Sequence, residues 1–164
     1  MSDGLARFNG QSRDEAERHL LAAFASRRWA ERVAASRPYT DFAALLETCE
    51  SAWADLAADD WLAAFKAHPR IGEGGGHSPK SSEREQAGVR GAPAETMAAI
   101  AEENRRYEAR FGHVFLIFAS GRTASEVLAE LRRRMDNSPA TEVSVAAEEH
   151  RKITRLRLER MLSE

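Results

Sequence analysis

The sequence predicts an all-α protein, a single-domain bundle of about eight helices that spans residues 1–164. Apolar residues recur at helical spacing along most of the chain, and helix-capping patterns precede several of these stretches. The one β-like run, residues 114–118, has no second strand to pair with, and it fits a buried turn of helix equally well. A domain of this length buries enough surface to fold without a disulfide or a structural metal.

Four helices are predicted in the first half of the chain, from capping side chains at their starts and prolines after their ends. The first helix starts at Ser12, which forms a capping box with Glu15, and the second starts at Arg27. The third starts at Thr40 or Asp41, and the fourth at Asp59 or Asp60. Pro38 ends the second helix and Pro69 ends the fourth. The segment 71–81 then holds four of the ten glycines together with Pro79, which predicts a loop. Loops of this length without secondary structure often carry function.

Four more helices are predicted in the second half by the same kinds of signal. Their starts are Ser82 with Glu85 as a second capping box, Pro93, Thr123 with Glu126 as a third, and Thr141. Their stops are Gly112 and the run Asn137-Ser138-Pro139, and the last helix is expected to reach Leu162.

The composition argues against several classes of protein. A net charge of −2 with 30% charged residues describes a surface of mixed sign, so we expect no nucleic-acid partner. The local basic run 132–134 fits a solvated helix end. No apolar stretch is long enough to span a membrane and no signal peptide is visible, so we expect no membrane partner and a cytoplasmic location.

The single cysteine, Cys49, has apolar neighbours at helical spacing in Leu45, Leu46 and Trp53. A buried structural thiol is therefore favoured over a nucleophile. One cysteine excludes an internal disulfide, which fits a reducing compartment.

His68 is a candidate general acid or base, because it lies between a predicted helix and the glycine-rich loop and titrates near neutral pH. The proline that follows, Pro69, fixes its backbone. The alternative is a histidine that only interacts with the negative end of the helix dipole. Ser82 and Glu85 also have two interpretations, because the start of a helix with a capping box also offers backbone N–H groups to a polar or anionic ligand.

The other histidines give weaker signals. His19 and His150 lie in polar helical stretches and are expected to be exposed, whereas His77 lies in the loop and His113 follows a predicted helix end. No pair of histidines or cysteines has metal-ligand spacing, so the sequence predicts no metal site.

Two motifs are specific when they occur together: His68-Pro69-Arg70-Ile71-Gly72, and Ser82-x-x-Glu85-Gln86 some dozen residues later. With them the chain resembles the OHCU decarboxylases, which convert 2-oxo-4-hydroxy-4-carboxy-5-ureidoimidazoline (OHCU) to (S)-allantoin in urate degradation. Further matching segments are Arg37-Pro38-Tyr39, Asp60-Trp61 with Phe65, Phe111-Gly112, Phe115 to Gly121, Arg134-x-x-Asn137 with Glu142, Lys152-Ile153 and Leu156-Arg157-Leu158.

The resemblance implies an all-α fold, a homodimer, and a lyase that uses neither a metal nor an organic cofactor. It also implies that His68 is the catalytic acid or base. The segments that it places around the substrate comprise Pro69, Ser82, Glu83, Arg84, Glu85, Gln86, Phe115, Leu116, Ile117, Phe118 and Ala119.

The reaction is compatible with these residues. Loss of CO₂ leaves an electron pair, and the substrate's own ring C=N can accept it, so neither pyridoxal, thiamine nor metal is needed. We expect His68 to move the proton linked to the 4-hydroxyl or a ring nitrogen, with Glu85 as a second catalytic residue that orients it. Ser82 and Gln86 would bind the ureido and ring carbonyls, and the backbone of residues 115–119 would contact the ring edge.

Two rival functions remain open. A helical binding module would have no pocket that joins residue 68, residues 82–86 and residues 115–119. A hydrolase acting on 5-hydroxyisourate, the preceding intermediate, would usually be an all-β chain, which the helical pattern argues against.

Overall fold

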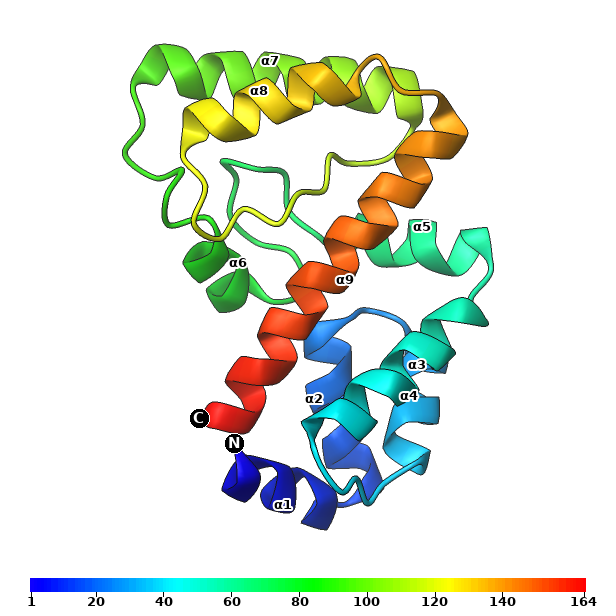
Figure 1. Cartoon of the computed structure of the whole chain (residues 1–164). Helices are drawn as coiled ribbons and strands as arrows, with labels where there is room; N and C mark the ends of the chain where they lie inside the picture. Colours follow the sequence, from blue (N-terminus) through cyan, green and yellow to red (C-terminus); the bar gives the residue numbers. More distant parts are fainter. The chain divides into compact units, whose positions relative to one another are not determined.

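The computed structural model describes residues 1–164 and contains nine α-helices and no strand, which confirms the all-α prediction (Figure 1). The helices are α1 (Ser2–Gly10), α2 (Arg13–Ala23), α3 (Arg27–Ala35), α4 (Phe42–Ala54), α5 (Ala58–Lys66), α6 (Pro79–Glu85), α7 (Ala94–Phe111), α8 (Ala124–Arg134) and α9 (Pro139–Ser163). None of the helices is both long and apolar enough to cross a membrane.

The chain forms two compact units. Unit 1 contains residues 1–64 and 153–164, and unit 2 contains residues 65–152. Helix α9 therefore contributes its first part to unit 2 and its last turns to unit 1. The catalytic candidates from the sequence all belong to unit 2.

The helix ends follow the predicted caps closely. Ser12 and Thr123 each complete a capping box, in which the side-chain oxygen accepts from the backbone N–H three residues later. Asp41 rather than Thr40 caps α4, where its Oδ1 accepts from the N–H of Ala44 at 2.8 Å. Gly112 ends α7 with a φ of 78°, a left-handed conformation that glycine adopts without strain.

An aromatic cluster forms the interior of unit 1. Phe24 is fully buried, and its ring lies 5.2 Å from the rings of both Trp29 and Trp61. Trp29 stacks on Trp53 at 5.5 Å and donates its indole N–H to the carbonyl of Cys49. The cluster joins the end of α2 to α3, α4 and α5. Its ring pairs are tilted, edge-on or stacked, which are arrangements that aromatic side chains favour.

Helix α1 has no side-chain cap, and its sequence did not predict it. Arg37 holds its end, because its guanidinium donates to the carbonyls of Phe8 and Gln11 at 2.7 and 2.9 Å. Gly4 lies against the backbone of Leu162, where any Cβ would clash. These tertiary contacts within unit 1, which local sequence does not reveal, stabilise the short helix.

In unit 2, α7 and α8 lie side by side (Figure 1) and cover the irregular segment 112–123. The apolar core joins α7 and α8 with this segment and with the residues on either side of α6. Its buried members are Ile71, Val89, Ile100, Tyr107, Phe115, Ile117, Ala119, Ala124, Val127 and Leu131.

Candidate functional site

His68 lies in the non-helical segment 67–78 that follows α5. This segment includes most of the loop predicted for residues 71–81, but residues 79–81 already belong to α6. The segment folds back on itself, because the N–H of His77 donates to the carbonyl of Ala67 at 2.9 Å. Gly76 has a φ of 76°, and a Cβ there would lie 2.6 Å from Cδ of Pro69. The backbone on both sides of His68 is therefore held in place by a contact that only glycine allows.

The His68 ring is buried, with 7% of the residue exposed. Its Nε2 lies 3.0 Å from Nε2 of His150 in α9, and the ring of His77 lies edge-on to it at 5.2 Å. The expectation that His150 is exposed was wrong, since this residue is fully buried. The same expectation for His19 is confirmed.

Helix α6 corrects the predicted start of a helix at Ser82. The helix begins at Pro79, three residues earlier, because proline at the first helical position loses no hydrogen bond and has a suitable φ. The N–H groups of Ser82 and Gln86 donate to the carbonyls of Ser78 and Ser82, each at 3.0 Å. The segment is thus the last turn of α6, and the prediction that it starts a helix and offers free N–H groups to a ligand was wrong.

One face of α6 nevertheless gathers the expected side chains. Ser82, Glu85 and Gln86 are buried, whereas Glu83 and Arg84 are exposed. This is the i, i+3, i+4 spacing of a single helix face. Gln86 also fixes the glycine loop, because its side-chain oxygen accepts from the N–H of Gly72 at 2.9 Å.

A small pocket of about 100 Å³ opens beside α6. It is lined by Gly72, Glu73, Gly74, Ser82, Glu83, Gln86, Val89, Arg90 and Met97. Three of the residues implied for substrate binding therefore line it, whereas His68, Glu85 and residues 115–119 do not.

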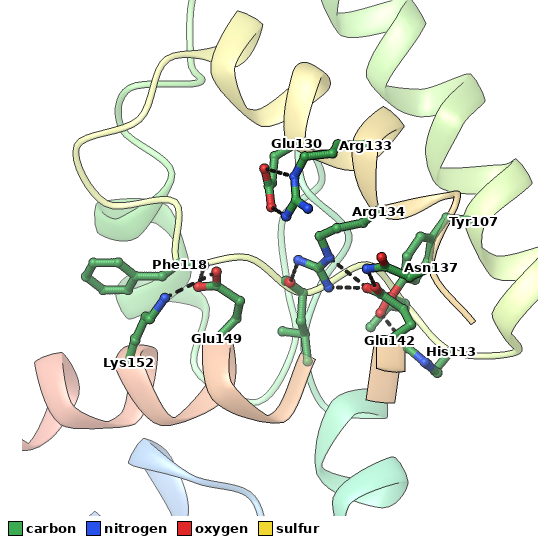
Figure 2. A network of polar contacts seen from close by, with 12 residues as sticks. Tyr107, His113, Phe118, Glu130, Arg133, Arg134, Asn137, Glu142, Glu149 and Lys152 are labelled. Atoms are coloured by element: carbon green, nitrogen blue, oxygen red, sulfur yellow. Dashed lines mark hydrogen bonds and ion pairs between the residues drawn. The ribbon is translucent and has the colours of Figure 1, made fainter. Parts of the chain in front are cut away.

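The segment 115–119 is extended, and side chains from two helices hold its backbone (Figure 2). Arg134 donates to the carbonyl of Leu116 at 2.6 Å, and Glu149 accepts from the N–H of Phe118 at 3.1 Å. The side chains of Phe115, Ile117 and Ala119 are buried in the core of unit 2, and Phe118 is half-buried. The backbone is thus what this segment can offer to a ligand.

Gly88 brings the end of α6 close to the turn that follows residues 115–119. A Cβ at residue 88 would clash with the carbonyl oxygen of Arg122. The close approach places two of the implied substrate-binding segments on neighbouring parts of unit 2, and a larger side chain would push them apart.

The guanidinium of Arg134 is the centre of a buried polar network (Figure 2). It is fully buried and pairs with the equally buried Glu142, whose carboxylate also accepts from Tyr107 at 2.5 Å and from Asn137 at 3.0 Å. Burial and the hydrogen bond to this carboxylate raise the pKa of Tyr107, which therefore stays protonated. The interpretation of residues 132–134 as a solvated helix end was thus wrong for Arg134.

No group of three or more histidine, cysteine, aspartate or glutamate residues is arranged to hold a metal ion. Cys49 is fully buried in unit 1, which confirms the prediction of a structural thiol position. Burial raises the pKa of this thiol to about 12, so it is protonated at neutral pH.

The chain was compared with known protein families and structures. The profile of the OHCU decarboxylases matches residues 9–159. The chain belongs to the OHCU decarboxylase family. The resemblance inferred from the two sequence motifs is therefore confirmed, and the match extends over both units.

The curated relatives of this family member differ in length. The chain is 32% identical over 145 residues to the uric acid degradation bifunctional protein TTL of Arabidopsis thaliana and covers 45% of that protein. It is 32% identical over 141 residues to the 2-oxo-4-hydroxy-4-carboxy-5-ureidoimidazoline decarboxylase of Haloferax volcanii and covers 82% of it. The chain thus spans less than half of the first relative and most of the second.

Two solved structures share the fold of this chain. A crystal structure of OHCU decarboxylase in the presence of (S)-allantoin is 34% identical, with a TM-score of 0.78 over 90% of this chain and 99% of that one. A structure of (S)-allantoin synthase, 18% identical with a TM-score of 0.75, covers 96% of this chain and 53% of that one, and it supports the fold alone.

Three buried residues that bond to the candidate site were given no role from the sequence of this family member. They are Arg134, Glu149 and His150. What two of them share becomes visible only once the buried face of α9 is known. The buried positions of α9 in unit 2 are Glu142, Ala146, Glu149 and His150, a regular helical stripe in which three of four residues are polar. Polar residues on a buried stripe need partners, which marks them for attention.

Proposed function

We propose that this chain decarboxylates OHCU to (S)-allantoin in urate catabolism. The observation that carries the proposal is the family match over residues 9–159, which includes both specific motifs. The burial of His68, Ser82 and Glu85 in one unit adds support, because a few polar groups in an otherwise apolar interior are typical of a small-molecule site.

In the proposed reaction the bond between C4 and the carboxylate breaks and CO₂ leaves. The electron pair enters the adjoining ring C=N, whose nitrogen takes up a proton from water. The 4-hydroxyl loses its proton, and C5 gains one. We assign the proton transfer to His68, which is the histidine of the family motif. Delivery of the proton to one face of the ring gives a single enantiomer.

Binding of the substrate is assigned to the α6 face and to the backbone of residues 115–119. Ser82 and Gln86 line the pocket and carry the hydroxyl and amide groups that hydrogen-bond carbonyls. We propose that Glu85, buried on the same face, orients His68 and binds a substrate N–H. Pro69, Glu83, Arg84 and the residues Phe115, Leu116, Ile117, Phe118 and Ala119 complete the proposed site.

Three further properties belong to the proposal. We propose that the 164 residues act as one catalytic domain, that two copies form a homodimer, and that the reaction needs no metal or organic cofactor. The cytoplasm is the proposed location, since a single cysteine fits a reducing compartment.

The proposal is tested by generating OHCU from urate in situ and following its decay with and without the protein, in the presence and absence of EDTA. The wild type is expected to accelerate the decay equally in both and to yield one enantiomer of allantoin. His68→Asn should lower kcat about 10²–10⁴-fold, because asparagine cannot carry a proton between groups.

The exposed His19 provides a matched control, and His19→Asn should leave kcat unchanged. Substrate binding by His68→Asn should fall much less than kcat, because the contacts from α6 remain. If His68→Asn kept near-normal turnover and still produced a single enantiomer of allantoin, His68 would not be part of the mechanism.

A further inference from the structure

His68 and His150 form a close contact between two titratable rings in unit 2. Their Nε2 atoms lie 3.0 Å apart, the ring centroids lie 4.4 Å apart, and the rings are almost perpendicular at 86°. Two imidazole nitrogens at this distance form a hydrogen bond only when one carries the proton and the other presents its lone pair. One proton therefore lies between the two rings.

This contact assigns different tasks to the two nitrogens of His68. Nε2 is engaged with His150, so a proton exchanged with a ligand has to pass through Nδ1. When Nδ1 accepts a proton, Nε2–H of the resulting imidazolium donates to the lone pair of His150 in a charge-assisted hydrogen bond. Such bonds are stronger than neutral ones, so His150 stabilises the protonated form of His68.

The two rings are held in different ways. His68 lies in the non-helical segment 67–78, whereas His150 lies in α9 and is fully buried. The ring of Phe65 packs near His150, with 6.0 Å between the centroids. Because α9 and the surrounding packing fix the ring of His150, this ring can orient the ring of His68, which belongs to an irregular segment.

We propose that His150 is a positioning residue for His68, and this inference rests on the function proposed above. His150 accepts the Nε2 proton of His68 and thereby fixes the tautomer whose Nδ1 takes the proton from the substrate. The same proton-bearing nitrogen then delivers a proton to C5, and His150 keeps its hydrogen bond throughout, so no proton is gained or lost by the pair over one turnover.

The kinetic test compares His150→Leu, which cannot hydrogen-bond, with His150→Gln, which can, after circular dichroism has shown that both are folded. His150→Leu should lower kcat about 10- to 100-fold, the range typical for loss of a group that orients a functional imidazole, with little change in KM. His150→Gln should recover most of the loss. His77→Leu, which changes another ring next to His68, is the matched control and should retain most of kcat.

A loss in His150→Leu that His150→Gln does not recover, or an equal loss in His77→Leu, would mean that the position acts by packing and would overturn the proposal. Unchanged kcat in His150→Leu would overturn it as well.

A second measurement does not depend on turnover or on the stability of a variant. In ¹⁵N-labelled wild-type protein, a scalar coupling between the Nε2 nuclei of His68 and His150 is expected across the hydrogen bond. Its absence, with both rings assigned, would overturn the pair. A wild type that shows the coupling but does not act on OHCU would contradict the proposed function and still support the pair.

Discussion

Unit 1 and unit 2 bury very different side chains. Ten of the thirteen buried polar or charged residues belong to residues 65–152, whereas unit 1 has only Ser26, Thr154 and Arg157. The interior of unit 1 is instead a cluster of aromatic rings. Because each buried polar group costs free energy unless it is bonded, the interior of unit 2 depends on hydrogen bonds and ion pairs much more than that of unit 1.

The two units also differ in how they hold their backbone. Unit 1 consists of helices with short connections. Side chains such as those of Ser12 and Asp41 cap the starts of these helices by accepting hydrogen bonds from backbone N–H groups. Unit 2 contains two irregular segments, 67–78 and 112–123, whose backbone groups are bonded by the side chains of Gln86, Arg134 and Glu149. The geometry of the candidate site therefore depends on side chains that do not belong to the segments they support.

Removal of the Arg134 guanidinium tests this dependence. Arg134→Met should lower the free energy of unfolding by about 3–5 kcal/mol, because Glu142 would remain buried without its cation. It should also lower kcat, since the carbonyl of Leu116 loses its donor. Urea unfolding and the OHCU assay measure the two effects.

The neighbouring Arg133 provides the control for Arg134, because it is exposed and pairs with Glu130 at the surface. Arg133→Met should cost less than about 1 kcal/mol. Equal losses in the two variants would contradict the importance assigned to the buried network.

A substitution in unit 1 should separate stability from activity. Phe24→Leu removes ring contacts with Trp29 and Trp61 and should cost about 1–3 kcal/mol of stability. At a temperature where the variant is folded, kcat should stay at the wild-type value. A large fall in kcat for the folded variant would show that the aromatic interior also shapes the site.

The smallest effects compare one helix start in each unit. Ser12→Ala and Thr123→Ala each remove the side-chain oxygen of a capping box and should cost about 1 kcal/mol, as measured by thermal unfolding. Similar losses would show that helices in both units begin by the same local rule. A far larger loss at Thr123 would indicate that this cap also holds the segment 112–123.

Features that depend on neighbouring residues along the chain could be predicted from the amino acids alone. Capping boxes, the αL glycine at residue 112 and apolar stripes specify helix ends and faces within a few residues, so the all-α fold was predictable. The one clear boundary error, at Ser82, arose because the same residues fit a cap or the last turn of a helix, and Pro79 decided between them. The family followed from two motifs whose spacing is specific.

Which polar residues meet inside the protein depends on contacts between distant segments and could not be predicted. His68 and His150 are 82 residues apart in the chain, and Arg134 reaches Leu116 across 18 residues, so no local pattern joins them. His150 and Arg134 looked exposed because charged neighbours surround them in the sequence. Their burial depends on which face of a helix packs inward, and packing, unlike capping, is set by contacts between distant segments.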